Sequence, residues 1–242
     1  MKQIRLLFAF LLFTLSSVAV LGQGSDSSSS DAIRRGNERF SRGEYQLAIK
    51  EYGRVSPDAG ETYATALYNT GVCFYELWNT TEAISYYRKA VASRLGRYPA
   101  ALHALGAALR DEGQIAEAKQ AIDQSIRTSG GRYAPAHYLS ALMAMSEGDH
   151  QRAATAFKRS IDAFKAERKD RFPAGHNNLG VALARMGRLA EARRAFEIAL
   201  RQSEGEFEEA THNLKLCSSL LAKAPGTLAS LKTVEAHQMP DK

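Results

Sequence analysis

The stretch LGVALARMGRLAEARRAF (residues 179–196) decides the fold, because its pattern occurs four more times along the chain. It aligns without gaps with RGNERFSRGEYQLAIKEY (35–52), TGVCFYELWNTTEAISYY (70–87), LGAALRDEGQIAEAKQAI (105–122) and SALMAMSEGDHQRAATAF (140–157). Successive copies are 35, 35, 35 and 39 residues apart. Self-similarity at a period of about 20–50 residues is typical of proteins built from stacked repeats.

Three positions of the pattern predict what each copy folds into. The second position is small, at Gly36, Gly71, Gly106, Ala141 and Gly180. Alanine follows twelve residues later, at Ala48, Ala83, Ala118, Ala153 and Ala192. A bulky apolar residue comes four positions further on, at Tyr52, Tyr87, Ile122, Phe157 and Phe196. Apolar residues at three- and four-residue intervals on both sides of a turn predict two antiparallel helices, whose small residues allow close packing.

This pattern resembles the tetratricopeptide repeat (TPR) family, whose unit of about 34 residues carries a similar glycine-to-alanine spacing. The resemblance extends over Asp31 to Glu206, with local departures at Ala141 and at Trp78, which replaces a turn glycine. It implies an all-α fold: a right-handed α-solenoid of about five antiparallel helix pairs with a C-terminal capping helix. A single pair cannot bury its apolar face, so neighbouring pairs must stack.

The composition agrees with a helical protein. The 242 residues include 39 Ala but only 7 Val, 9 Ile and 6 Pro, so strand formers are scarce. An all-β fold is therefore disfavoured, as is a parallel α/β sheet with its Val- and Ile-rich central strands. The formal net charge of +6 is mild and by itself indicates neither an acidic partner nor nucleic acid.

The N-terminus has the features of a secretory signal peptide. Two basic residues precede an apolar run from Leu6 to Leu21, which is shorter than the roughly 20 residues that span a membrane. We therefore expect residues 1–22 to be a cleaved signal and 23–30 to be a Ser-rich flexible linker. The expected location is exported, either periplasmic or secreted, and an uncleaved N-terminal membrane anchor is the alternative.

The repeat period divides the remaining chain. Five units are expected at about 31–62, 63–97, 98–132, 133–171 and 172–206. Continuing the period places Lys215 at the small position of a helix expected over 207–222. Lysine fits there only if no second helix packs on it, as in the polar terminal cap of a repeat array. We expect a flexible tail over 223–242, with a weak helical pattern to about His237.

No motif for catalysis or metal binding is recognisable. Cys73 and Cys217 occupy the same repeat position four units apart, which is too far for a disulfide, and we expect both to be buried thiols. His137 and His176 also share a position, and no group of His, Cys, Asp or Glu has metal-ligand spacing. A phosphate-binding loop and a nucleophile elbow are also missing. We therefore predict no catalytic residue, no cofactor and no metal.

Basic residues concentrate between Arg152 and Arg201, where 12 Lys or Arg accompany 5 acidic residues. Most lie on second helices or in the loop Lys165 to Arg171, which in the TPR family form the outer surface. A solvated face is the simplest interpretation, and the export signal further disfavours nucleic acid as a partner.

The family resemblance also implies a binding surface, because first helices of TPR proteins line a concave groove that takes extended peptides or helices. Transferring its inward positions gives the candidate partner-binding residues Asn37, Phe40, Tyr68, Val72, Tyr75, His103, Arg110, Tyr138, Leu142, Met145, Asn177 and Arg185. Tyrosine, methionine and arginine are enriched in interfaces. The alternative is that part of this set only packs between units.

A carboxylate clamp, one familiar use of the TPR fold, is expected to be absent. Asn37 and Asn69 match it, but Ile33, Ala100 and Ala104 occupy its basic positions. The groove therefore suits apolar and aromatic side chains, with Arg110 and Arg185 as candidate anchors for acidic groups.

The resulting prediction is a non-enzymatic protein–protein interaction scaffold outside the cytoplasm, which binds peptide or helix segments of partner proteins and could belong to envelope assembly machinery. One alternative is an accessory subunit, or a glycan or small-ligand binder, of an envelope enzyme. Another is a membrane-anchored TPR cofactor.

Overall fold

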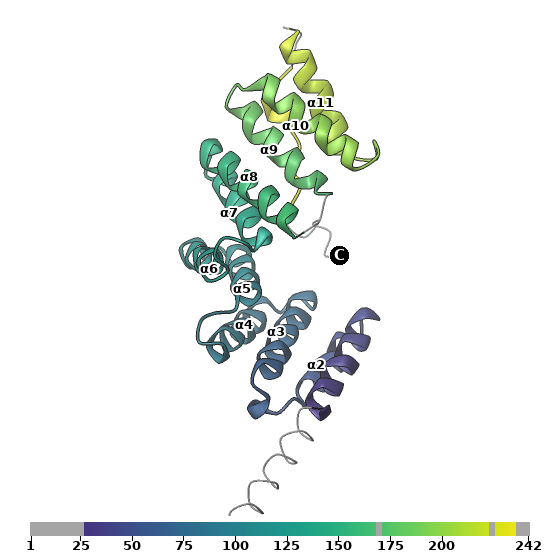
Figure 1. Ribbon diagram of the computed structural model, residues 1–242, viewed down its shortest axis with the longest axis vertical. Helices are drawn as coiled ribbons and strands as arrows, with labels where there is room; N and C mark the ends of the chain where they lie inside the picture. Colours follow the sequence, from purple (N-terminus) through teal and green to yellow (C-terminus); the bar gives the residue numbers. More distant parts are fainter. Residues whose placement is uncertain (1–26, 168–170, 223–225, 236–242) are drawn as a thin grey trace, which may run out of the picture. The chain divides into compact units, whose positions relative to one another are not determined.

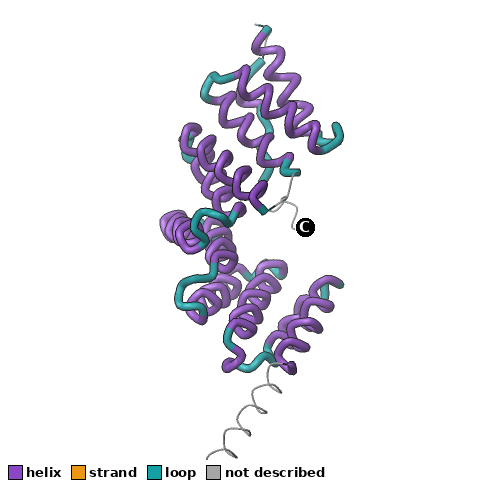
Figure 2. Tube along the Cα trace, in the orientation of Figure 1, coloured by secondary structure: helices purple, strands orange, loops and turns teal. Residues whose placement is uncertain are grey.

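The computed structural model describes residues 27–167, 171–222 and 226–235. Every regular element in these ranges is a helix (Figure 2), which confirms the all-α prediction. The expected signal peptide lies outside the described residues, and none of the described helices is long and apolar enough to cross a membrane. The chain forms two compact units that divide within the third repeat, unit 1 ending at Glu112 and unit 2 beginning at Gly113.

Unit 1 is a run of paired helices (Figure 1). It contains a helix over residues 27–41, α2 (Tyr45–Tyr52), the 3-10 turn η1 (Pro57–Ala59), α3 (Glu61–Glu76), α4 (Thr80–Ser93) and α5 (Pro99–Asp111). The predicted pair of α3 and α4 is thus present, and α3 also packs on α2.

The first helix includes residues 27–30, where the sequence predicted a flexible linker. Serine is a weak helix former, but tertiary packing overrides propensity. Ser29 is 2% exposed and Ala32 is 1% exposed, so burial of this turn replaces the expected linker with helix.

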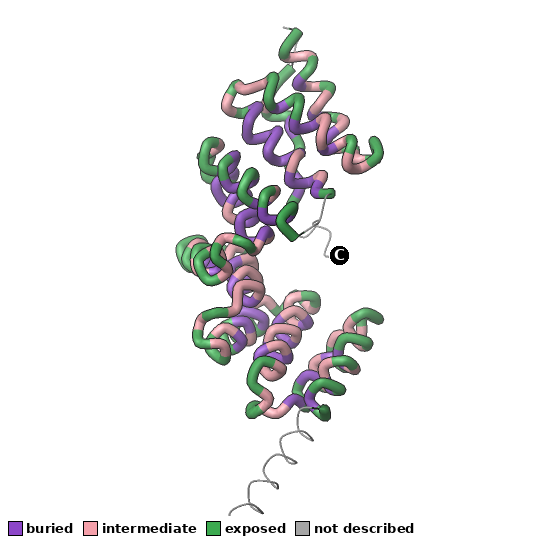
Figure 3. The backbone as a smooth tube through the Cα atoms, in the orientation of Figure 1, coloured by how far each residue is buried: buried purple, intermediate pink, exposed green. Residues whose placement is uncertain are grey.

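Unit 2 contains α6 (Ile115–Thr128), α7 (Ala134–Ser146), α8 (His150–Ala166), α9 (Pro173–Arg185), α10 (Leu189–Gln202), α11 (Glu208–Leu221) and the 3-10 turn η2 (Leu228–Ser230). The first helices α7 and α9 are buried along most of their length, whereas α10 exposes one side (Figure 3). A helix that is apolar on nearly all sides is covered on all sides. These first helices therefore form the centre of unit 2.

The recurrent glycine lies directly beneath the bulky residue of the second helix. A Cβ added to Gly180 would lie 2.5 Å from a ring carbon of Phe196, and one added to Gly71 would lie 2.6 Å from the Tyr87 ring. The latter would also lie 3.3 Å from the carbonyl oxygen of Ala83, the recurrent alanine. At these two positions only glycine leaves room for the ring of the second helix, which explains the sixteen-residue spacing between the glycine and the bulky residue.

The turns between the two helices of a repeat require a left-handed backbone. Glycine supplies it at Gly43, Gly113, Gly148 and Gly187, where φ lies between 73° and 77°. Trp78 holds the equivalent position with φ of 61° and is 89% exposed. Such a conformation costs a residue with a Cβ about 1–2 kcal/mol, so this turn of unit 1 is strained.

Candidate functional site

The C-terminal segment, Leu231–Glu235, lies against the first helices of unit 2, although the sequence predicted a flexible tail with weak helical character. Leu231 has φ of −67° and ψ of 132°, within the polyproline II region. Side chains three residues apart share a face in that conformation. Leu231 and Val234 are accordingly 6% and 3% exposed and join the apolar cluster of unit 2, while Lys232, Thr233 and Glu235 remain exposed.

Asn213 on α11 pairs with the backbone of Lys232. Its Oδ1 accepts a hydrogen bond from the Lys232 N–H at 2.8 Å, and its Nδ2 donates to the Lys232 carbonyl oxygen at 2.7 Å. Nδ2 of Asn177 on α9 donates to the same carbonyl at 3.1 Å. A side-chain amide carries the donor and acceptor of a peptide group. Asn213 therefore pairs with Lys232 much as the backbone of an adjacent strand would.

Asn178 on α9 makes the equivalent pair with Val234, two residues along the segment. Its Oδ1 accepts from the Val234 N–H at 2.8 Å and its Nδ2 donates to the Val234 carbonyl oxygen at 2.7 Å. The Tyr138 hydroxyl on α7 donates to this carbonyl at 2.7 Å and accepts from Nδ2 of Asn178 at 2.8 Å. Three successive first helices thus hold one stretch of extended backbone.

We call Tyr138, Asn177, Asn178 and Asn213 the polar row. All four side chains are fully buried. Within the row, Nδ2 of Asn213 donates to Oδ1 of Asn177 at 2.9 Å, and Nδ2 of Asn177 donates to Oδ1 of Asn178 at 3.1 Å. Each of the three asparagine amides therefore uses both of its N–H donors. One N–H donates to another member of the polar row, and the other donates to a carbonyl oxygen of the C-terminal segment. The hydrogen bonding of the row is complete only with that backbone in place.

Burial and charge keep the Tyr138 hydroxyl protonated. Burial raises the pKa of Tyr138, and the carboxylate of Glu235 raises it further. The hydroxyl therefore remains a hydrogen-bond donor to a carbonyl oxygen across the physiological pH range.

Hydrogen bonds and burial of two aliphatic side chains hold the C-terminal segment on unit 2. Each hydrogen bond contributes about 1 kcal/mol net, and burying each aliphatic side chain contributes about 2 kcal/mol. Fixing a residue in an extended conformation costs about 1–2 kcal/mol. Seven hydrogen bonds, including one between His212 and the Ser230 carbonyl, and two aliphatic side chains act on residues 226–235. These hydrogen bonds and buried side chains are the contributions that oppose the entropy cost of ordering the segment.

Four of the five predicted binding residues of unit 2 belong to the polar row or to the apolar cluster that covers the C-terminal segment. Tyr138 and Asn177 belong to the polar row, and Leu142 and Met145 are buried in the apolar cluster that includes Leu231 and Val234. Arg185 is exposed at the end of α9. The sequence reasoning missed two residues of the row, namely Asn178 and Asn213. A signal was available, because asparagine stands two residues before the small-residue position at Asn69, Asn178 and Asn213.

The predicted residues of unit 1 remain more accessible. Asn37 is exposed, and the others are partly exposed: Phe40, Tyr68, Val72, Tyr75, His103 and Arg110. Oδ1 of Asn37 accepts from the Tyr52 hydroxyl at 2.8 Å and from Nδ2 of Asn69 at 3.2 Å. Asp111 accepts hydrogen bonds from both Tyr75 and Arg110. Arg110, a candidate anchor for acidic groups, is thus already ion-paired within unit 1.

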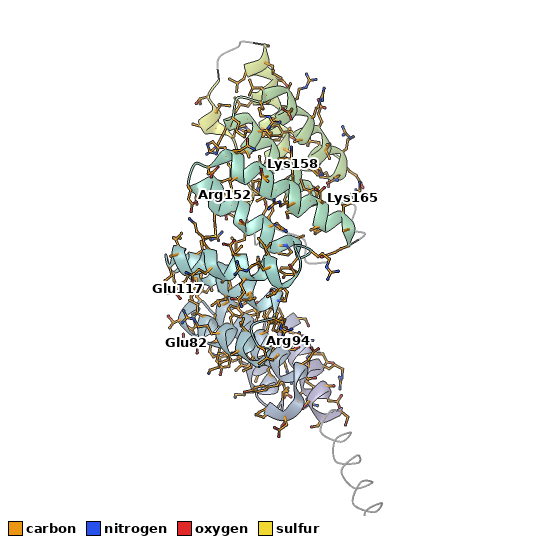
Figure 4. All side chains as sticks on the ribbon, turned by 60° about the vertical axis from the view of Figure 1, so that its left-hand side comes forward. Glu82, Arg94, Glu117, Arg152, Lys158 and Lys165 are labelled. Atoms are coloured by element: carbon orange, nitrogen blue, oxygen red, sulfur yellow. The ribbon has the colours of Figure 1, made fainter. Side chains whose placement is uncertain are left out.

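The two cysteines are buried, and the basic residues of α8 are exposed. Cys73 and Cys217 are buried free thiols, and burial raises the pKa of Cys73 to about 12, which disfavours the reactive thiolate. Across the described ranges, no three His, Cys, Asp or Glu side chains are grouped to hold a metal. Arg152, Lys158 and Lys165 are exposed along α8, on a second helix, as expected for a solvated outer face (Figure 4).

Comparison with known sequences and structures identifies the class. A family model described as tetratricopeptide repeat matches residues 33–94, 91–168 and 138–207. The chain belongs to the tetratricopeptide repeat family. TPR proteins are generally non-catalytic scaffolds with protein or peptide partners. Among curated proteins, none matches the sequence.

Solved structures share the fold at low sequence identity. PilF of Pseudomonas aeruginosa superimposes with a TM-score of 0.65 at 19% identity, covering 85% of this chain and 96% of its own. MamA gives a TM-score of 0.57 at 22% identity, covering 73% and 92%. YrrB, described as a TPR protein with an unusual peptide-binding site, gives 0.56 at 18% identity, covering 82% and 97%. These similarities establish the fold alone.

Proposed function

We propose that this protein is a non-enzymatic interaction scaffold whose unit 2 binds an extended segment of a partner protein along the polar row. The observation that carries the proposal is the double pairing of Asn178 and Asn213 with the N–H and C=O groups of alternate residues. Such pairing recognises an extended backbone whatever its sequence, because every non-proline residue carries both groups. A peptide-binding site in the structural neighbour YrrB agrees with this use of the fold.

The test is a selection of peptides from a random library displayed on phage, with the full chain as target. Peptides that bind should lose at least tenfold in affinity when Asn178→Ala and Asn213→Ala are combined, because each asparagine supplies two backbone contacts. Circular dichroism controls for retained helix content. Asn69→Ala in unit 1 is the matched control, since its amide pairs with Asn37 and not with a backbone. Peptides that bind the double variant as well as the unmodified chain would contradict this role of the row.

We also propose that the scaffold acts outside the cytoplasm, on the strength of the signal-like segment over residues 1–22. Its partners would then be exported proteins, with envelope assembly machinery as one setting. N-terminal sequencing of protein purified from the producing cells tests this proposal. A mature chain that begins after the apolar run supports export with cleavage. An intact Met1 on a membrane-bound chain favours the anchored alternative, and an intact Met1 on cytosolic protein contradicts export.

A further inference from the structure

We infer that the C-terminal segment is a built-in ligand of the polar row, and that the partner which replaces it is an extended protein segment with two aliphatic side chains three residues apart. This inference rests on the proposed function and adds the chemistry of the partner and the means by which its access is limited.

The hydrogen bonds to this end of the chain carry no sequence information. Those from the polar row end on backbone atoms of Lys232 and Val234, and the one from His212 ends on the backbone of Ser230. Any chain that presents N–H and C=O groups at the same spacing can make them. Selectivity must therefore come from side chains.

The side chains that the site selects are those of Leu231 and Val234. Both are buried in the apolar cluster of unit 2 together with Leu179 and Val181, whereas Lys232 and Thr233 between them are exposed. A partner that fills the same positions needs an aliphatic residue, two residues whose side chains face solvent, and a second aliphatic residue. Aromatic residues at these positions would demand more volume than a close-packed cluster provides.

The connection to α11 makes the segment a competitor. Only residues 222–230 separate α11 from Leu231. A short tether keeps a tethered ligand at millimolar effective concentration. An external segment of equal intrinsic affinity therefore binds weakly until the built-in segment leaves, and anything that holds the C-terminus elsewhere opens the site.

The test measures binding of the chain's own sequence in trans. A fluorescein-labelled peptide TLASLKTVE, residues 227–235, is titrated into the full chain and followed by fluorescence anisotropy. We expect Val234→Asp to bind the peptide at least tenfold more tightly than the unmodified chain, because a carboxylate cannot occupy the apolar cluster and the built-in segment is released. Thr233→Asp is the matched control: it adds the same charge one residue earlier, on an exposed position, and should bind like the unmodified chain.

Two further controls assign the binding to the polar row. Adding Asn178→Ala to Val234→Asp should weaken peptide binding at least tenfold while circular dichroism shows retained helix. A peptide with aspartate in place of both Leu231 and Val234 should not bind. Equal binding of the original peptide to the unmodified chain and to Val234→Asp would overturn the inference, as would failure of the folded Val234→Asp chain to bind it.

The outcome separates this inference from the proposed function. Library peptides that bind the unmodified chain and Val234→Asp equally, and that depend on Asn178, would leave the proposed function intact and overturn the built-in ligand. If Val234→Asp does not fold, hydrogen exchange of the unmodified chain decides. The Lys232 and Val234 amides, which donate to Asn213 and Asn178, should exchange at least tenfold more slowly than freely exposed amides. Unprotected amides, or protection that is lost on dilution and so assigns the segment to a second copy, would overturn it.

Discussion

The two units place asparagine at the same repeat position and use it differently. In unit 1, Asn69 is partly exposed and donates to the side chain of Asn37. In unit 2, Asn178 and Asn213 are fully buried and pair with the backbone of the C-terminal segment. The first helices on either side of Asn69 carry Arg34 and Ala104 at the equivalent positions. The two asparagines that pair with an extended backbone are therefore also the two that stand one repeat apart.

The largest expected effect concerns the packing that both units share. Phe196→Ala in unit 2 should lower the free energy of unfolding by about 3–5 kcal/mol, because it leaves a cavity above Gly180. Phe40→Ala in unit 1 should cost clearly less, since Phe40 is partly exposed. Urea denaturation followed by circular dichroism measures both. Equal losses of unfolding free energy in the two variants would contradict the tighter packing of Phe196 relative to Phe40.

The next effect depends on pH and is expected in both units. Burial lowers the pKa of His176 in unit 2 and of His103 in unit 1 to about 4. The unfolded chain, with histidine pKa near 6.5, then binds more protons than the folded chain between about pH 6.5 and 4. Stability should be full above this window and fall through it by about 2–3 kcal/mol per histidine. Below pH 4, titration of these two histidines should no longer change the stability.

Replacing His176 isolates the contribution of unit 2. Leucine occupies the same repeat position at Leu67 and Leu102, so His176→Leu is sterically reasonable. The variant should lose about half of the pH dependence attributed to the two histidines, as measured by urea denaturation at pH 7, 5.5 and 4. An unchanged slope would show that His176 titrates normally in the folded chain.

A smaller effect tests the comparison between the asparagines directly. Asn178→Ala should destabilise the protein by about 2 kcal/mol, because it leaves the buried Val234 N–H without an acceptor and removes the amide that donates to the Tyr138 hydroxyl. Asn69→Ala should change stability by no more than about 0.5 kcal/mol, as is usual for accessible positions. Chemical denaturation measures the difference, and similar values for the two variants would remove the distinction between the units.

The smallest expected effect is stabilising. Trp78→Gly should relieve the left-handed strain in unit 1 and raise stability by about 0.5 kcal/mol, since the greater freedom of unfolded glycine offsets part of the gain. In unit 2, Gly187→Ala at the equivalent turn should destabilise by about 1 kcal/mol. The melting temperatures of the two variants show whether each is more or less stable than the unmodified chain. A lower melting temperature for Trp78→Gly would show that the exposed indole contributes to folding.

The sequence predicts what repeats and misses what occurs once. Gly180 and Phe196 are sixteen residues apart as in every unit, so their contact and the helix pairs around it follow from the register. The row on α7, α9 and α11 was only half predicted, because Tyr138 and Asn177 stand at positions taken from the family, whereas Asn178 and Asn213 do not. The placement of Leu231 and Val234 has no periodic signal at all, since it depends on a cluster assembled from helices distant in sequence.

The C-terminal segment also has a consequence for biosynthesis. Residues 231–235 follow α7, α9 and α11 in the sequence and supply backbone partners for side chains of all three helices. Because synthesis runs from the N-terminus, Asn178 and Asn213 are made before the backbone groups of Lys232 and Val234, so these hydrogen bonds of unit 2 can form only after residues 231–235 have been added.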